Sequence, residues 1–200
     1  MEKEKIMAII EALVFASEKP LRTKYIEQVV SVIDLGEFTL SGLLQDLKDK
    51  YAAETSALEL AEVAEGWQFR TKPQFAEWIK RLNTVRPSKL SQPAMETLAI
   101  VAYRQPITRA EIDYIRGVDS GGVVKTLLDK RLIKIVGKKD LPGRPLVYGT
   151  TQEFLEVFSL KDITSLPNLQ DIKQISAAEE ELERNQTELP LASQESSEEE

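Results

Sequence analysis

The sequence predicts an α+β fold, mainly α-helical, with two small winged-helix (winged helix-turn-helix) domains in tandem and a disordered acidic C-terminal tail. One order of elements occurs twice along the chain: a helix, a proline turn, two more helices and a β-hairpin. The prolines of the two turns, Pro20 and Pro106, are 86 positions apart. Residues 176–200 are rich in Glu, Ser and Gln, a composition typical of disorder.

The repeat and the change of composition divide the chain into four expected parts. These are a first domain over residues 1–84, a linker over 85–90, a second domain over 91–160, and an extension with the tail over 161–200. Each domain is about the smallest size that still buries a workable core.

In the first domain, apolar residues keep helical spacing and then give way to two β-prone runs. A hairpin turn is expected at Glu65-Gly66. The expected elements are helices over 6–16, 23–33 and 40–51, strands over 58–63 and 67–71, and a closing helix from Pro73 to Leu82.

The second domain has clearer helix boundaries. Thr108 and Glu111 have the spacing of a capping box, and Gly117 is placed to end the same helix. Arg22 stands where the first domain would need such a cap, so that cap should be weaker. The other expected features are helix starts at Ser91 and Ser120, strands over 132–136 and 146–149, and a wing loop over 137–145.

The composition excludes most catalytic chemistry. The chain has no Cys and no His, which removes thiol nucleophiles, Cys/His zinc sites and Ser-His-Asp triads. No phosphate-binding glycine motif and no acidic metal loop is present. We therefore expect a protein that is not an enzyme and that needs no cofactor or metal. No run is apolar for long enough to span a bilayer, so we expect a cytoplasmic location and no membrane partner.

Net charge argues against a dedicated DNA-binding protein. The net charge of the chain is −7. Residues 179–200 alone carry a net charge of −8, so residues 1–178 sum to +1. The third helix of each domain mixes cations with carboxylates, whereas major-groove reading needs a clear set of donors. The wing loop of the second domain holds the compact basic group, which offers possible phosphate contacts at Lys138, Lys139 and Arg144.

The first helix of each domain is apolar nearly all round, over residues 6–16 and 95–102. Either both are central core helices, or each presents a second face to another protein. The second reading predicts self-association through the first helix, and the residues predicted to line the dimer interface are Ile6, Met7, Ile10 and Val14.

Several stretches resemble the segregation and condensation protein B family. Residues 97–112 read TLAIVAYRQPITRAEI and are followed by IRGV at 115–118. Residues 142–151 read PGRPLVYGTT, with Phe154 after them. IEALVFA at 10–16 and TKP at 71–73 are similar as well, so the resemblance covers about residues 6–167. Lys19 and Arg22 depart from the family pattern, which affects only the strength of a local cap.

This resemblance implies a homodimer of tandem winged-helix domains, paired mainly through the first domain. It implies binding to the central region of a kleisin, segregation and condensation protein A, which bridges the head domains of an SMC ATPase. Such a complex condenses and partitions the bacterial chromosome, and this subunit catalyses nothing. DNA would be bound only weakly or through the complex.

The residues expected to bind the kleisin come from the second domain. An aromatic ring and guanidinium groups are good interface anchors. The expected contacts are Tyr103, Arg104, Gln105, Arg116 and Arg144. Arg116 could instead offset its helix dipole, and Arg144 could hold the wing to the domain. The alternative function is that of a winged-helix transcriptional regulator that binds DNA.

Overall fold

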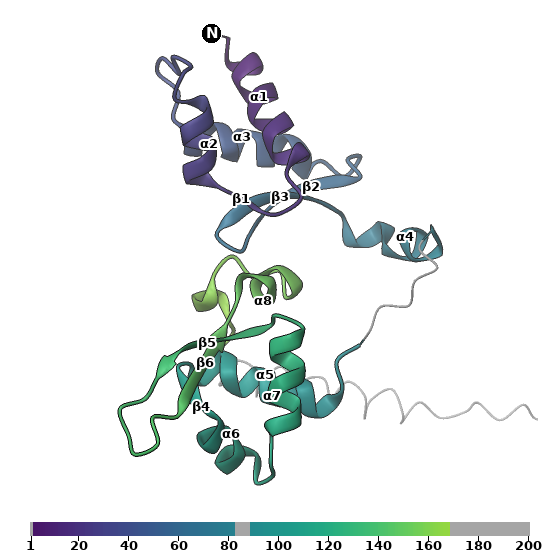
Figure 1. The fold of residues 1–200 in the computed structure, drawn as a ribbon. Coiled ribbons are helices and arrows are strands. Elements are labelled where there is room, and N and C mark those ends of the chain that lie inside the picture. The colour runs from purple at the N-terminus through teal and green to yellow at the C-terminus, as the bar shows by residue number, and fades with distance from the viewer. Residues whose placement is uncertain (1, 83–88, 169–200) are drawn as a thin grey trace, which may run out of the picture. The chain divides into compact units, whose positions relative to one another are not determined.

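The computed structural model describes residues 2–82 and 89–168 (Figure 1). Residues Met1–Thr164 group into one unit and Ser165–Glu200 into another. We call the elements up to Leu82 the first module and those from Gln92 to Val157 the second module. The predicted linker at 85–90 lies largely, and the predicted tail beyond 168 wholly, outside the described residues.

The first module contains helices on a three-stranded antiparallel sheet with strand order β1-β3-β2. Its elements are α1 (Lys3–Ala16), β1 (Leu21–Arg22), α2 (Thr23–Val30), α3 (Leu40–Ala52), β2 (Leu58–Val63), β3 (Gly66–Thr71), the 3₁₀-helix η1 (Pro73–Phe75) and α4 (Ala76–Leu82).

The second module repeats this order, with a sheet in the order β4-β6-β5. Its elements are α5 (Gln92–Arg104), β4 (Ile107–Thr108), α6 (Arg109–Arg116), α7 (Gly121–Asp129), β5 (Ile133–Lys138), β6 (Leu146–Thr150) and α8 (Gln152–Val157), and a 3₁₀-helix η2 (Ile163–Ser165) follows. The predicted repeat is confirmed in element order. The structure has mixed helices and small sheets, as expected.

The predicted hairpin turn of the first module is wrong by one residue. Val63 pairs with Gly66, so the two-residue turn is Ala64-Glu65, and both turn residues have positive φ, 50° and 60°. Gly66 has a different role. A Cβ atom there would lie 2.8 Å from the carbonyl carbon of Pro20, so the missing side chain lets β1 approach β3.

Other boundaries shift by a few residues. α2 ends at Val30 rather than at residue 33, and β5 begins at Ile133. The two-residue strands β1 and β4 and the helix α8 were not predicted. A two-residue strand has no alternation to detect, and it forms only because a hairpin offers it an edge.

The caps of α6 confirm the sequence analysis. Thr108 Oγ1 accepts from the Glu111 backbone N–H at 3.3 Å, and the Thr108 backbone N–H donates to Glu111 Oε2 at 2.9 Å. Gly117 ends the helix with φ 72°. At the equivalent position in the first module, Arg22 makes no side-chain cap. Ser120 does precede α7, but its backbone N–H and hydroxyl both donate to Asp113.

The capping box gives a stability test. Thr108→Ala should lower the free energy of unfolding by about 1 kcal/mol, because it removes the hydroxyl that accepts from the Glu111 backbone N–H in the first turn of α6. Ser91→Ala is the matched control, since Ser91 precedes α5 without a side-chain cap bond. Urea denaturation should show a loss for the first variant and almost none for the second. Equal losses would mean that the capping bond does not stabilise α6.

Candidate functional site

One face of α1 is consumed by the core of the first module. Ile6, Ile10 and Val14, spaced four residues apart, are at most 1 % exposed. They pack in one cluster with Ile26 and Val30 of α2, Leu43, Leu44 and Leu47 of α3, and Leu60 and Trp67 of the sheet. Such a stripe is what a helix on a small core requires.

This burial corrects the predicted dimer interface. Ile6, Ile10 and Val14 cannot contact a second copy of the folded module, and Met7 is half-buried against the same core. Both faces of α1 are apolar, so periodicity alone did not distinguish them. The branched aliphatic side chains occupy the core, and the small residues with one aromatic remain outside.

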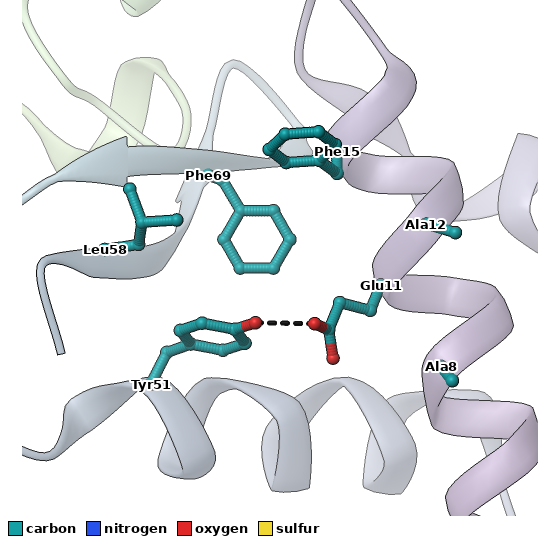
Figure 2. A pocket seen from close by; sticks show the side chains of 7 residues that line it. All are labelled: Ala8, Glu11, Ala12, Phe15, Tyr51, Leu58 and Phe69. Carbon is teal, nitrogen blue, oxygen red and sulfur yellow. Dashed lines mark hydrogen bonds between the residues drawn. The ribbon is translucent and has the colours of Figure 1, made fainter.

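The outer face of α1 borders a groove (Figure 2). Ala8, Ala12 and Phe15 lie on this face at spacings of four and three residues, and Phe15 is 73 % exposed. The groove has a volume of about 350 Å³. The complete lining is Ala8, Glu11, Ala12, Phe15, Tyr51, Leu58 and Phe69.

The polar groups of the groove satisfy one another. The Tyr51 hydroxyl donates to Glu11 Oε1 at 2.6 Å, and Lys50 Nζ donates to Oε2 at 2.8 Å (Figure 2 shows the first bond). The hydrogen bonds from Lys50 and then Tyr51 lower the pKa of Glu11. The bond to Glu11 and burial raise the pKa of Tyr51 to about 12. Both groups hold fixed protonation states at neutral pH, so the walls of the groove are left to make apolar contacts.

The C-terminal end of α5 carries three of the predicted kleisin contacts. Tyr103 is half-buried and Arg104 is exposed. Gln105 ties α5 to the sheet, because its Oε1 accepts from the Thr150 N–H at 2.7 Å and its Nε2 donates to the Ala102 carbonyl at 3.3 Å. A substitution of Gln105 would therefore disturb the fold as well as any contact with a partner.

Arg116 lies on the C-terminal end of α6 against α5. Its side chain is only 9 % exposed, and its Nη2 lies 3.5 Å from Glu96 Oε2. Its buried Nε has no hydrogen-bond partner within the described residues. Arg116 is thus mainly a packing residue between two helices, with little of its surface available to a partner.

The basic group on the wing is partly engaged. Lys139 Nζ contacts Glu111 Oε1 at 2.6 Å, which joins the wing to the capping box of α6. Lys138 and Arg144 are exposed, and Arg144 has a positive φ of 41°. The structure therefore presents two of the three predicted phosphate contacts outward and uses the third within the module.

Among residues 2–82 and 89–168, no three acidic side chains gather into a group that could hold a metal ion. No helix in those ranges is long and apolar enough to cross a membrane.

Comparison with known families identifies the chain. The family model described as "Segregation and condensation complex subunit ScpB" matches residues 8–169, which cover most of the first module and all of the second. The chain belongs to the ScpB family. A segregation and condensation protein B from Syntrophotalea carbinolica is 50 % identical over 182 residues, 91 % of each chain. The predicted family is thereby confirmed.

Two solved structures of ScpB proteins are also similar. One is ScpB from Mycobacterium tuberculosis, 31 % identical over 79 % of this chain and 97 % of the other, with a TM-score of 0.37. The other is a dimer of an ScpB N-terminal domain complexed with ScpA peptide, 25 % identical over 40 % of this chain and 96 % of the other, with a TM-score of 0.36. The ScpB assignment rests on the sequence matches.

Sequence reasoning missed the groove. Glu11 is the one charged residue within the apolar stretch 6–16 of α1, and its partners Lys50 and Tyr51 lie about 40 positions away. A carboxylate in an otherwise apolar helix indicates a cation or hydroxyl across from it. That signal was present, but it does not show which residue pairs with the Glu11 carboxylate.

Acid should weaken the wing contact. Hydrogen bonds from Lys139 and then from Thr108 lower the pKa of Glu111 to about 2. A folded-state pKa below the unfolded value stabilises the protein above about pH 4.3, and that contribution is lost as the pH falls toward 2. The stability difference between wild type and Glu111→Gln should be constant from pH 7 to about pH 5 and shrink below it, as urea titrations can measure. A pH-independent difference would mean that the ionised carboxylate contributes nothing.

Proposed function

We propose that the protein is a non-catalytic subunit of a condensin-like SMC–kleisin complex that acts in bacterial chromosome segregation and condensation. In this proposal both modules are winged-helix domains, the first forms a homodimer, and the second binds the central region of the kleisin. The SMC heads are reached through the kleisin, in the cytoplasm. The observation that carries the proposal is the ScpB family match, which spans both modules.

The element order supports the winged-helix assignment. Each module has a helix, a short strand, two helices and a hairpin, with the short strand beside the second hairpin strand. This is the helix-turn-helix plan with a β wing. The repeat follows from the sequence, since the apolar helices and the turn prolines Pro20 and Pro106 recur in the same order.

The kleisin surface is proposed at the end of α5, near Tyr103 and Arg104. A half-buried tyrosine beside an exposed arginine has the chemistry of an interface anchor. Arg144 on the exposed wing also belongs to the proposed set, whereas the mostly buried Arg116 would contribute little contact surface. Gln105 supports that surface by fixing the end of α5 to β6.

The third helices favour scaffolding over DNA reading. On α3, Gln45 Nε2 donates to Asp49 at 2.8 Å, and Lys50 is bound to Glu11. On α7, Lys125 is exposed between Asp119 and Asp129 in the sequence. A recognition helix needs such donors aimed at base edges, and two of those on α3, Gln45 and Lys50, are already used within the module.

A binding measurement tests the kleisin surface. Calorimetry with the central region of the cognate kleisin should show that Tyr103→Ala loses about 1–3 kcal/mol of binding free energy, as a buried aromatic anchor does. Lys125→Ala on α7 is the control and should bind as wild type does. Melting curves of each variant separate lost contact from lost fold. Unchanged affinity of a folded Tyr103→Ala, Arg104→Ala double variant would remove this surface from the proposal.

A gel shift tests the DNA alternative. The isolated protein should bind duplex DNA weakly and without sequence preference, because only two or three cations form a compact group. Two or three phosphate contacts give a shallow salt slope of about −2 to −3. In ~150 mM salt binding should be almost undetectable. Nanomolar binding that discriminates between sequences would replace the scaffold proposal with the regulator.

A further inference from the structure

The groove beside α1 favours an apolar occupant of side-chain size. Its own polar atoms are paired, with Glu11 bound to both Tyr51 and Lys50, so a polar ligand would find few open partners. The aromatic rings of Tyr51 and Phe69 meet edge to face at 4.8 Å and form one wall. Aromatic side chains pack well on such walls.

Phe15 is itself an unsatisfied apolar group at the rim. At 73 % exposure it leaves most of a large ring in water, although it stands on the most apolar helix of the module. An exposed aromatic next to an apolar groove is self-complementary, which is the property a two-fold interface needs. A second copy can then fill each groove with the ring that the other exposes.

Charges at the ends of α1 fix how two copies would align. Glu4 and Lys5 lie at its start, and Glu18 and Lys19 lie just after its end, all exposed. If two α1 helices run antiparallel about a point between Glu11 and Ala12, Glu4 faces the other copy's Lys19 and Lys5 faces its Glu18. In a parallel pair, each charged residue would face the same residue of the other copy, and the like charges would repel each other.

We propose that two copies of this chain pair through antiparallel α1 helices, and that Phe15 of each copy enters the groove of the other over Ala8. The same alignment that matches the charges sets Phe15 opposite Ala8, where the small side chain leaves room for a ring. Ala12 then lies at the two-fold axis. This inference rests on the homodimer of the proposed function and specifies its contact.

Single cysteines in the full-length chain test the alignment. The chain has no native Cys, so each variant carries one thiol. Under mild oxidation Ala12→Cys should form a disulfide-linked dimer, because the two positions are offset by only about 1.5 Å along the helices. Ala8→Cys is the matched control on the same exposed face. Its two copies would be about 10 Å apart along the axis, beyond the reach of a disulfide.

A second measurement tests the ring. In sedimentation, Phe15→Ala should raise the dimer dissociation constant roughly 30-fold or more, as loss of an aromatic anchor does. Tyr114→Ala removes an aromatic of the second module that is 88 % exposed and should leave that constant unchanged. Phe15 is outside the core, so the melting temperature of the monomer should hardly change.

The outcomes separate the contact from the dimer. Cross-linking of both cysteine variants would indicate parallel helices, and cross-linking of neither in a protein that sediments as a dimer would place the interface elsewhere. Either result overturns the α1 contact and leaves the homodimer standing. A wild type that is monomeric at micromolar concentration would overturn both.

Discussion

Burial of one stripe of α1 governs everything that the first module can present outward. Ile6, Ile10 and Val14 fill the space between α2, α3 and the sheet, and their removal from water is the main favourable term in so small a core. A helix has only one side left once that stripe is placed. The face with Ala8, Ala12 and Phe15 is therefore exposed because of the core, and the groove exists because the core fixes α1 beside Tyr51 and Phe69.

In the second module a comparable role falls to polar contacts at the ends of helices. Gln105 closes α5 onto β6, and Glu111 serves both the cap of α6 and the wing lysine Lys139. Helix ends carry unpaired backbone groups, so side chains that satisfy them also fix where the next element starts. The surfaces proposed for recognition, at the end of α5 and on the wing, are held in position by these fixed helix ends.

Sequence reasoning succeeded where the signal is local. The capping box at Thr108, the helix stop at Gly117 and strand β2 were predicted from neighbouring residues, and the repeat gave the order of elements. It failed where the decision is tertiary. Which apolar face of α1 turns inward depends on where α3 lies, and the bond between Gln105 and Thr150, 45 residues apart, has no local signal that would predict it.

Gly66 shows how far one missing side chain reaches. Any larger residue there would push against Pro20 and Leu21, so β1 would leave the sheet. The hairpin would then be a two-stranded ribbon, which has little stability of its own. Because β1 leads directly into α2, the same displacement would loosen the entry of that helix. Tolerance to mutation in the first module is therefore expected to be lowest at a position with no side chain at all.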